Sequence, residues 1–248
     1  MSGHSKWAQI KRQKGAADVK RGAIFTKLAR EITIAAKSGL PDPELNFRLR
    51  LAVQHARENN MPADNIDRAI KRAAGASDGA ELHEIMYEGY GPGGAALLVQ
   101  AMTDNRNRTV AEVRSTFTRA GGSLGEAGSV AWQFQNRGVI TIEVNGADPD
   151  ELALQALEAG ADDARVEAGE VVVYTEPGSL EGIRTNLEAA KLAVTHADVS
   201  MVPSTPVALD EKDSLSLIRL VERLEELDDV QQVFTNAEFD EAVLSNLG

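Results

Sequence analysis

The residues best suited to bind a ligand are cations near the start of the chain. Several flank Trp7, and the charge continues into the segment that follows. Cations beside an aromatic side chain suit nucleic acid, because counterions released from phosphates supply affinity and an indole stacks on an unpaired base. The alternative is a solvated helix face with Trp7 packed against neighbouring helices. The candidate contacts are Lys6, Trp7, Lys11, Arg12, Lys14, Lys20, Arg21 and Lys27.

A second basic group, residues 103–109 (TDNRNRT), stands in acidic surroundings. It joins the end of an expected strand to the start of an expected helix, where open α/β units usually bind ligands. Arg106 and Arg108, with amide and hydroxyl donors at a helix N-terminus, would hold a phosphate. Equally, Asp104 and Asn107 could be caps and turn residues, with the arginines paired to Glu88 or Glu112.

The glycine-rich stretch from Gly89 to Gly94 (GYGPGG) matches the G-x-G-x-x-G spacing of dinucleotide-binding loops. Such a loop must leave a strand and open a helix, so that backbone N–H groups face the pyrophosphate. Here the glycines lead into a strand-like run, and Pro92 has no backbone N–H. We therefore interpret the stretch as a structural turn and expect no cofactor.

Residues typical of catalytic or metal sites are sparse. Ser129 lies in Ala-Gly-Ser-Val and not in the G-x-S-x-G nucleophile elbow. The acid pairs Asp162/Asp163 and Asp228/Asp229 fall where loops are expected, and we interpret them as solvated turn carboxylates. The sequence therefore predicts no catalytic residue, no metal site and no enzymatic activity. The histidines, which have no partner at the spacing of a helical metal site, are His4, His55, His83 and His196.

The net charge of minus 12 over 248 residues is unevenly distributed. Residues 1–75 carry fifteen Lys/Arg against seven Asp/Glu, whereas residues 76–248 carry eleven against thirty-one. A basic module can bind phosphates, and the acidic remainder cannot do so broadly. The net charge alone would argue against nucleic acid, but its distribution confines the expected contacts to the N-terminal part and the arginines of residues 103–109.

Length and composition set further limits. About 250 residues predict two or three domains. The absence of cysteine excludes a disulfide scaffold, thiolate zinc sites and a cysteine nucleophile. The first residues lack the apolar stretch of a signal peptide, and no run approaches the roughly 18 apolar residues of a membrane helix. We expect a soluble, cytoplasmic protein without a membrane partner.

Apolar periodicity predicts three helices in the basic part. The first spans about residues 18–38, the second follows Pro43, and the third runs from Pro62 to about Ala73. In the first helix, apolar side chains lie opposite a stripe of lysines, so that one face packs and the other presents cations. Residues 1–16 have no apolar period, and we expect them to form a mobile arm.

After a linker at residues 75–79, the periodicity becomes that of an α/β protein. A buried-strand run at 95–102, a helix at 109–120 and an alternating strand at Val130, Trp132 and Phe134 predict one β-α-β unit. Residues 138–202 follow the β-α-β-β-α-β order of the ferredoxin-like split motif. The remaining segment predicts another β-α-β unit that completes the first.

The expected fold class is therefore α+β with three domains, an N-terminal three-helix domain and two ferredoxin-like α/β domains, one inserted in the other. The boundaries that we expect are residues 1–75 for the helical domain, 80–135 plus 205–248 for the discontinuous domain, and 136–204 for the insertion.

Two long blocks of the chain resemble the YebC/PmpR family. They are GHSKWAQIKRQKGAADVKRGAIFTKLAREI and YEGYGPGGAALLVQAMTDNRNRTVAEVRSTFTRAGGSLGEAGSVAWQFQNRGVI. The resemblance covers essentially the whole chain and implies the same three-domain fold without enzymatic activity. Members carry the label of probable transcriptional regulators that bind DNA. The family also includes a mitochondrial translational activator and bacterial ribosome-associated factors that help synthesis of proline-rich stretches.

Two functions follow as expectations. A DNA-binding transcriptional regulator would read base edges in the major groove, yet the sequence shows no plain helix-turn-helix. A ribosome- or rRNA-bound translation factor needs only phosphate contacts and stacking, and the charge distribution slightly favours it. The expected partner is DNA or rRNA, with the ribosome included in the second case. The oligomeric state stays open, and a monomer is compatible with the sequence.

Overall fold

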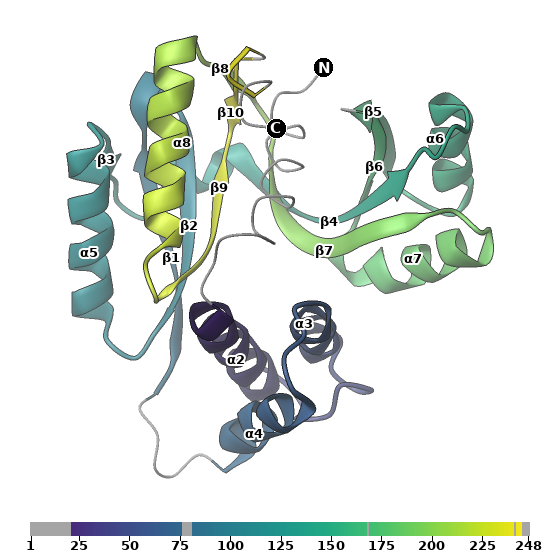
Figure 1. Ribbon diagram of the computed structural model, residues 1–248, viewed down its shortest axis with the longest axis horizontal. Coiled ribbons are helices and arrows are strands. Elements are labelled where there is room, and N and C mark those ends of the chain that lie inside the picture. Colours follow the sequence, from purple (N-terminus) through teal and green to yellow (C-terminus); the bar gives the residue numbers. More distant parts are fainter. Residues whose placement is uncertain (1–20, 76–80, 168, 241, 245–248) are drawn as a thin grey trace. The chain divides into compact units, whose positions relative to one another are not determined.

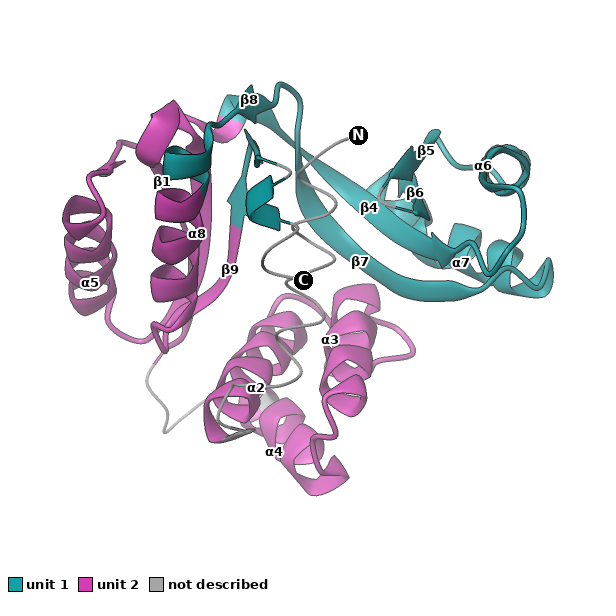
Figure 2. Ribbon diagram, turned by 45° about the horizontal axis from the view of Figure 1, so that its top comes forward, with its two compact units in different colours: residues 1–13, 132–214, 234–248 teal, residues 14–131, 215–233 magenta. Residues whose placement is uncertain are grey.

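The computed structural model describes residues 21–75, 81–167, 169–240 and 242–244. The chain forms two compact units, each assembled from separate segments (Figure 2). Among the described residues, those from 21 to 131 and from 215 to 233 form unit 2, and those from 132 to 214 and from 234 to 244 form unit 1. None of the described helices is long and apolar enough to cross a membrane.

The helical part of unit 2 contains α2 (Arg21–Lys37), α3 (Phe47–Glu58) and α4 (Ala63–Ala74). Asn46 starts α3, because its Oδ1 accepts a hydrogen bond from the Leu49 N–H at 3.1 Å and so satisfies a free helix donor. The three predicted helices are confirmed over these ranges. Their apolar faces form one core, which includes Leu28, Ile32, Leu49, Val53 and Ile66.

The second part of unit 2 is a four-stranded sheet in the order β3-β1-β2-β9. The hairpin of β1 and β2 is antiparallel and pairs His83 with Thr103 at one end and Tyr90 with Ala96 at the other. The elements are β1 (His83–Tyr90), β2 (Ala96–Thr103), α5 (Arg106–Arg119), β3 (Ser123–Leu124), α8 (Glu211–Glu225) and β9 (Val230–Thr235), all labelled in Figure 1.

Glycines allow two helices to approach this sheet closely. A Cβ atom on Gly89 would lie 2.7 Å from the Phe117 ring of α5, and one on Gly91 would lie 2.7 Å from Leu217 of α8. Residues two apart in extended chain face the same side, so α5 and α8 cover one face of the sheet. The glycine-rich stretch connects β1 to β2 through a short 3-10 turn, Pro92–Gly94, in which Gly93 and Gly94 have positive φ. The interpretation as a structural turn is confirmed.

The strands of this region differ from the prediction at two places. The strand β1 was not predicted from the sequence. The strand predicted at Val130, Trp132 and Phe134 is wrong, because Ala131–Gln133 forms a 3-10 turn and a strand begins only at Phe134. The backbone N–H groups of Val130 and Ala131 both donate to the Glu88 carboxylate at 2.8 Å and are therefore not available to a strand ladder.

Unit 1 contains the expected ferredoxin-like arrangement. Its sheet has the order β5-β6-β4-β7, in which all neighbouring strands are antiparallel. The buried side chains Leu152 and Ala156 lie on one helix, and Leu180, Ile183 and Leu187 on the other. The elements are β4 (Phe134–Glu143), α6 (Pro149–Glu158), β5 (Asp163–Glu167), β6 (Glu170–Thr175), α7 (Leu180–Ala189) and β7 (Val194–Pro203).

A small parallel pair completes unit 1, formed by β8 (Val207–Ala208) and β10 (Ala237–Glu238). The strand predicted at 205–209 therefore belongs to a separate two-stranded sheet and does not join the four-stranded sheet of unit 2. The observed architecture confirms the mixed α and β fold class with a helical N-terminal part and a two-part remainder. The ferredoxin-like strand order belongs to residues 134–203, and the sheet of unit 2 has its own order.

Candidate nucleic-acid interface

The predicted contacts divide into two sets. Lys27, Arg106 and Arg108 have described side chains, and Arg21 begins α2 without a described side chain. The binding role of all of them stays a prediction. The predicted contacts that lie outside the described residues are Lys6, Trp7, Lys11, Arg12, Lys14 and Lys20.

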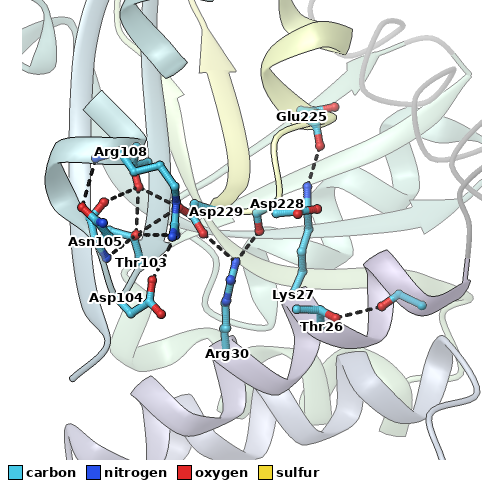
Figure 3. A network of polar contacts seen from close by, with 12 residues as sticks. Thr26, Lys27, Arg30, Thr103, Asp104, Asn105, Arg108, Glu225, Asp228 and Asp229 are labelled. Atoms are coloured by element: carbon cyan, nitrogen blue, oxygen red, sulfur yellow. Dashed lines mark hydrogen bonds and ion pairs between the residues drawn. The ribbon is translucent and has the colours of Figure 1, made fainter. Parts of the chain in front are cut away.

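Two cations of α2 contact the end of α8 and the turn that follows it (Figure 3). The Lys27 Nζ donates a hydrogen bond to the backbone carbonyl of Glu225 at 2.5 Å. The Arg30 Nη1 donates to the backbone carbonyl of Asp228 at 2.5 Å and lies 3.0 Å from Oδ1 of Asp229. The expectation that the lysine stripe of this helix is presented to solvent is therefore wrong for Lys27.

Asp229 is the centre of a polar cluster. Its Oδ2 accepts hydrogen bonds from the Thr109 Oγ1 at 2.7 Å, the Arg108 Nη2 at 2.8 Å and the Thr103 Oγ1 at 3.0 Å (Figure 3). Its side chain is only 2% exposed. The expectation of a solvated turn carboxylate is wrong for this residue. Asp229 directly precedes β9, and its side chain is buried at the start of that strand.

The surroundings of Asp229 favour its charged form. Burial raises the pKa of this carboxyl, but the hydrogen bonds from Arg108, Thr109 and Thr103 and the positive charge of Arg30 outweigh burial. The pKa therefore lies below its ordinary value. We call Asp229 with these four partners the Asp229 cluster.

The arginines of residues 103–109 have different surroundings. Arg108 pairs with Asp104 at 3.0 Å and with Asp229, not with the expected Glu88 or Glu112. The helix cap is Asn105, whose Oδ1 accepts from the Arg108 N–H at 3.1 Å. Arg106 is exposed and makes no ion pair within the described part of the chain. Only Arg106 presents an uncompensated charge here.

Glu88 is a second buried carboxylate, and it accepts hydrogen bonds from main-chain donors. Its oxygens accept from the backbone N–H groups of Gly128 at 2.7 Å and of Val130 and Ala131 at 2.8 Å. Burial raises its pKa, but these three hydrogen bonds outweigh burial and hold the pKa below the ordinary value. Glu88 therefore fixes the segment before β4 and has a structural role.

A cleft of about 590 Å³ adjoins α2 and α4. Three arginines line it, namely Arg30 from α2 and Arg68 and Arg72 from α4. Sequence reasoning missed the last two as candidate contacts. Their spacing of four residues was the available signal, because it places both guanidinium groups on one face of a helix.

The lining of this cleft combines charge with apolar surface. Phe25 and Met61 contribute the apolar part, and Asn65 and Thr26 contribute polar groups. The acid in the lining, Asp104, is already paired with Arg108. Within the residues that the structure describes, no group of three or more His, Cys, Asp or Glu side chains could hold a metal ion. The arrangement can bind an anion that carries a flat or apolar group.

Comparison with known proteins gives matches along both parts of the chain. Residues 5–76 match the family described as TACO1/YebC protein N-terminal domain, and residues 82–237 match the TACO1/YebC second and third domain. A probable transcriptional regulatory protein from Dehalococcoides mccartyi is 54% identical over 244 residues, 98% of this chain and 97% of that protein. One from Roseiflexus castenholzii is 56% identical over 243 residues, 96% of this chain and 95% of that protein.

A solved structure extends the similarity to the fold. The crystal structure of a conserved hypothetical protein from Aquifex aeolicus has a TM-score of 0.81 and 44% sequence identity, and the match covers 90% of this chain and 93% of that chain. Because family matches, relatives and fold agree over nearly the whole length, the chain belongs to the TACO1/YebC family.

Proposed function

We propose that this protein is a non-enzymatic, nucleic-acid-binding regulator of gene expression that acts in the cytoplasm. Its relatives are named probable transcriptional regulatory proteins, which supports regulation of transcription through DNA. The observation that carries nucleic-acid binding is the concentration of positive charge in residues 1–75, against an acidic remainder. A basic module of this kind binds phosphates through counterion release.

A second function is favoured by the same charge distribution. Residues 136–248 carry seven Lys/Arg against twenty-four Asp/Glu, so this half of the chain would repel a duplex laid across it. Contact with rRNA on the ribosome needs only a small basic surface, with the acidic regions turned to solvent or to ribosomal proteins. We therefore keep, as the alternative, a translation factor that assists synthesis of proline-rich stretches.

Binding measurements on the purified full chain separate the two functions. We would titrate duplex DNA, rRNA fragments and whole ribosomes at several salt concentrations, because phosphate contacts appear as the slope of affinity against salt. Tight, sequence-selective duplex binding near physiological salt supports the transcriptional function and contradicts the alternative. Binding to ribosomes with weak, unselective duplex binding supports the translation factor. No binding to any of them contradicts the proposed function as a whole.

Removal of residues 1–16 tests the N-terminal contacts. We expect the shortened chain to bind nucleic acid more weakly and with a flatter salt dependence, because Lys6, Lys11, Arg12 and Lys14 are lost. Thermal unfolding of both chains controls for damage to the fold. Unchanged affinity would show that the first residues are not contacts.

A further inference from the structure

We infer that the cleft beside α2 and α4 holds one unpaired nucleotide of a nucleic-acid strand, with its phosphate on the arginines and its base against Phe25. This inference rests on the proposed function and adds the binding site and the form of the ligand. The following features of the cleft support it.

The arginines of the cleft offer donors to an anion. Arg72 is exposed and has no polar partner within the described residues. Arg68 is exposed and donates its Nε to the Asp64 carbonyl and its Nη2 to Asn65 of the same helix, which leaves Nη1 without a partner among the described residues. The contacts of Arg30 with Asp228 and Asp229 both use Nη1. Guanidinium groups of this kind bind phosphate oxygens through paired N–H donors.

The excess of positive charge in the lining of the cleft favours an anionic ligand. Its single acid, Asp104, is compensated by Arg108 at 3.0 Å. The carboxylate of Asp229, which faces Arg30, is compensated further by Arg108 and by two threonine hydroxyls. The charges of Arg68 and Arg72 therefore have no acidic partner in the lining, and a bound phosphate would supply one.

The remaining lining suits a base. Phe25 is only partly buried against the helical core, so part of its ring is accessible in the cleft. An aromatic face supports stacking of any base and does so without sequence preference. The volume of about 590 Å³ lies within the range of roughly 300–1,000 Å³ that holds a ligand of small-molecule size. A single nucleotide fits such a cleft, whereas a duplex would contact only its rim.

The first experiment compares two neighbouring cations of α4 in the full-length protein. Arg72→Ala removes a cation of the cleft, and Lys71→Ala removes a neighbouring exposed cation that does not line it. The probe is a fluorescent single-stranded RNA of about 12 nucleotides, within the usual site size. We expect Arg72→Ala to weaken binding about tenfold and Lys71→Ala about twofold, because only the first loses a directed charged hydrogen bond.

A second pair of measurements tests the base. Phe25→Leu keeps an apolar side chain for the core but removes the ring, and we expect it to weaken single-strand binding about tenfold. Binding of a duplex of the same length should change by less than about twofold. With a photoreactive thiouridine in the strand, the crosslinked peptides should include residues 25–33 or 61–72. Thermal unfolding confirms that each variant is folded.

The outcomes separate this inference from the proposed function. Equal effects of Arg72→Ala and Lys71→Ala, or crosslinks only elsewhere, would overturn the cleft while nucleic-acid binding itself stands. If uridine monophosphate or inorganic phosphate binds as tightly as the strand, the ligand is a free phosphate compound and the inference fails. If an acidic peptide competes equally well, the cleft is a protein-binding site. If the unaltered chain binds no nucleic acid, the proposed function fails with it.

Discussion

Two groups of arginines in unit 2 have opposite surroundings. In the Asp229 cluster, Arg108 and Arg30 meet a carboxylate that is 2% exposed and also receives two threonine hydroxyls. On α4, Arg68 and Arg72 are exposed and have no acidic partner among the described residues. The first group is suited to holding unit 2 together, and the second is suited to binding an external anion.

The difference shows that a local cluster of cations does not identify a binding surface. The arginines of residues 103–109 stand out in an acidic stretch, yet Arg108 is neutralised by Asp229, which lies 121 residues further along the chain. The arginines of α4 stand among acids in the sequence and still remain available. The pairing of each cation, not its density along the sequence, distinguishes a stabilising group from a ligand-binding one.

The largest expected effect is the loss of the Asp229 carboxylate. Asp229→Ala removes the acceptor that Arg30, Arg108 and two threonine hydroxyls share. We expect the free energy of unfolding to fall by about 3 kcal/mol. This is the lower end of the range for removing one partner of a buried ion pair, because the arginines can still reach water. Urea denaturation measures this loss.

Asp228→Ala is the matched control for this substitution. The Asp228 side chain is exposed, and Arg30 contacts only its backbone carbonyl. We expect its effect on unfolding to stay within about 0.5 kcal/mol. Similar losses in both variants would show that the Asp229 cluster does not stabilise unit 2.

A smaller effect should appear as a dependence of stability on pH. The folded-state pKa of Asp229 lies below its ordinary value of 3.8. Its contribution is therefore complete above about pH 5, and is lost as the pH falls through the lower, folded-state pKa. Urea midpoints measured down to about pH 3 should fall less steeply for Asp229→Asn than for the unaltered chain. Parallel curves would contradict a charged Asp229 as the centre of the cluster.

The difference between paired and unpaired arginines can also be tested within residues 103–109. Arg108→Ala should lower the urea midpoint, though less than Asp229→Ala, because Arg30 and the threonines still compensate the carboxylate. Arg106→Ala should leave the midpoint unchanged, since this exposed side chain forms no ion pair with any residue that the structure describes.

In nucleic-acid binding, we expect Arg106→Ala to have the larger effect of the two variants. If Arg106 is a phosphate contact, its removal weakens nucleic-acid binding by about twofold to fivefold and lowers the salt slope by about one unit. A loss of stability for Arg106→Ala, with no change in binding, would reverse the roles that we assign to these two arginines.

Much of the fold was predictable because its local signals were consistent. The three N-terminal helices combine apolar periodicity with proline or glycine at their ends, and the β-α-β-β-α-β order of the inserted region follows from its sequence of elements. The strand β1 was missed because its sequence, HEIMYEGY, contains two glutamates and a glycine, which do not suggest a strand. Glu88 is tolerated there because backbone donors bind it.

The candidate site was less predictable. The sequence alone determined the division into a basic N-terminal part and an acidic remainder, the family resemblance and the turn at the glycine-rich stretch. It identified Lys27 and Arg108 as cations but gave no sign that each has a partner about 120 or more residues away.

Only the tertiary structure decided which charges are compensated. Periodicity and spacing report which residues share a face of one helix, whereas ion pairs form between elements that are brought together by burial of their apolar faces. Packing of α2 near the turn before β9 places Arg30 beside Asp229, whereas Arg72 lines the cleft without a partner among the described residues. A charge is therefore specified by the sequence, but its availability to a ligand depends on the contacts that folding creates.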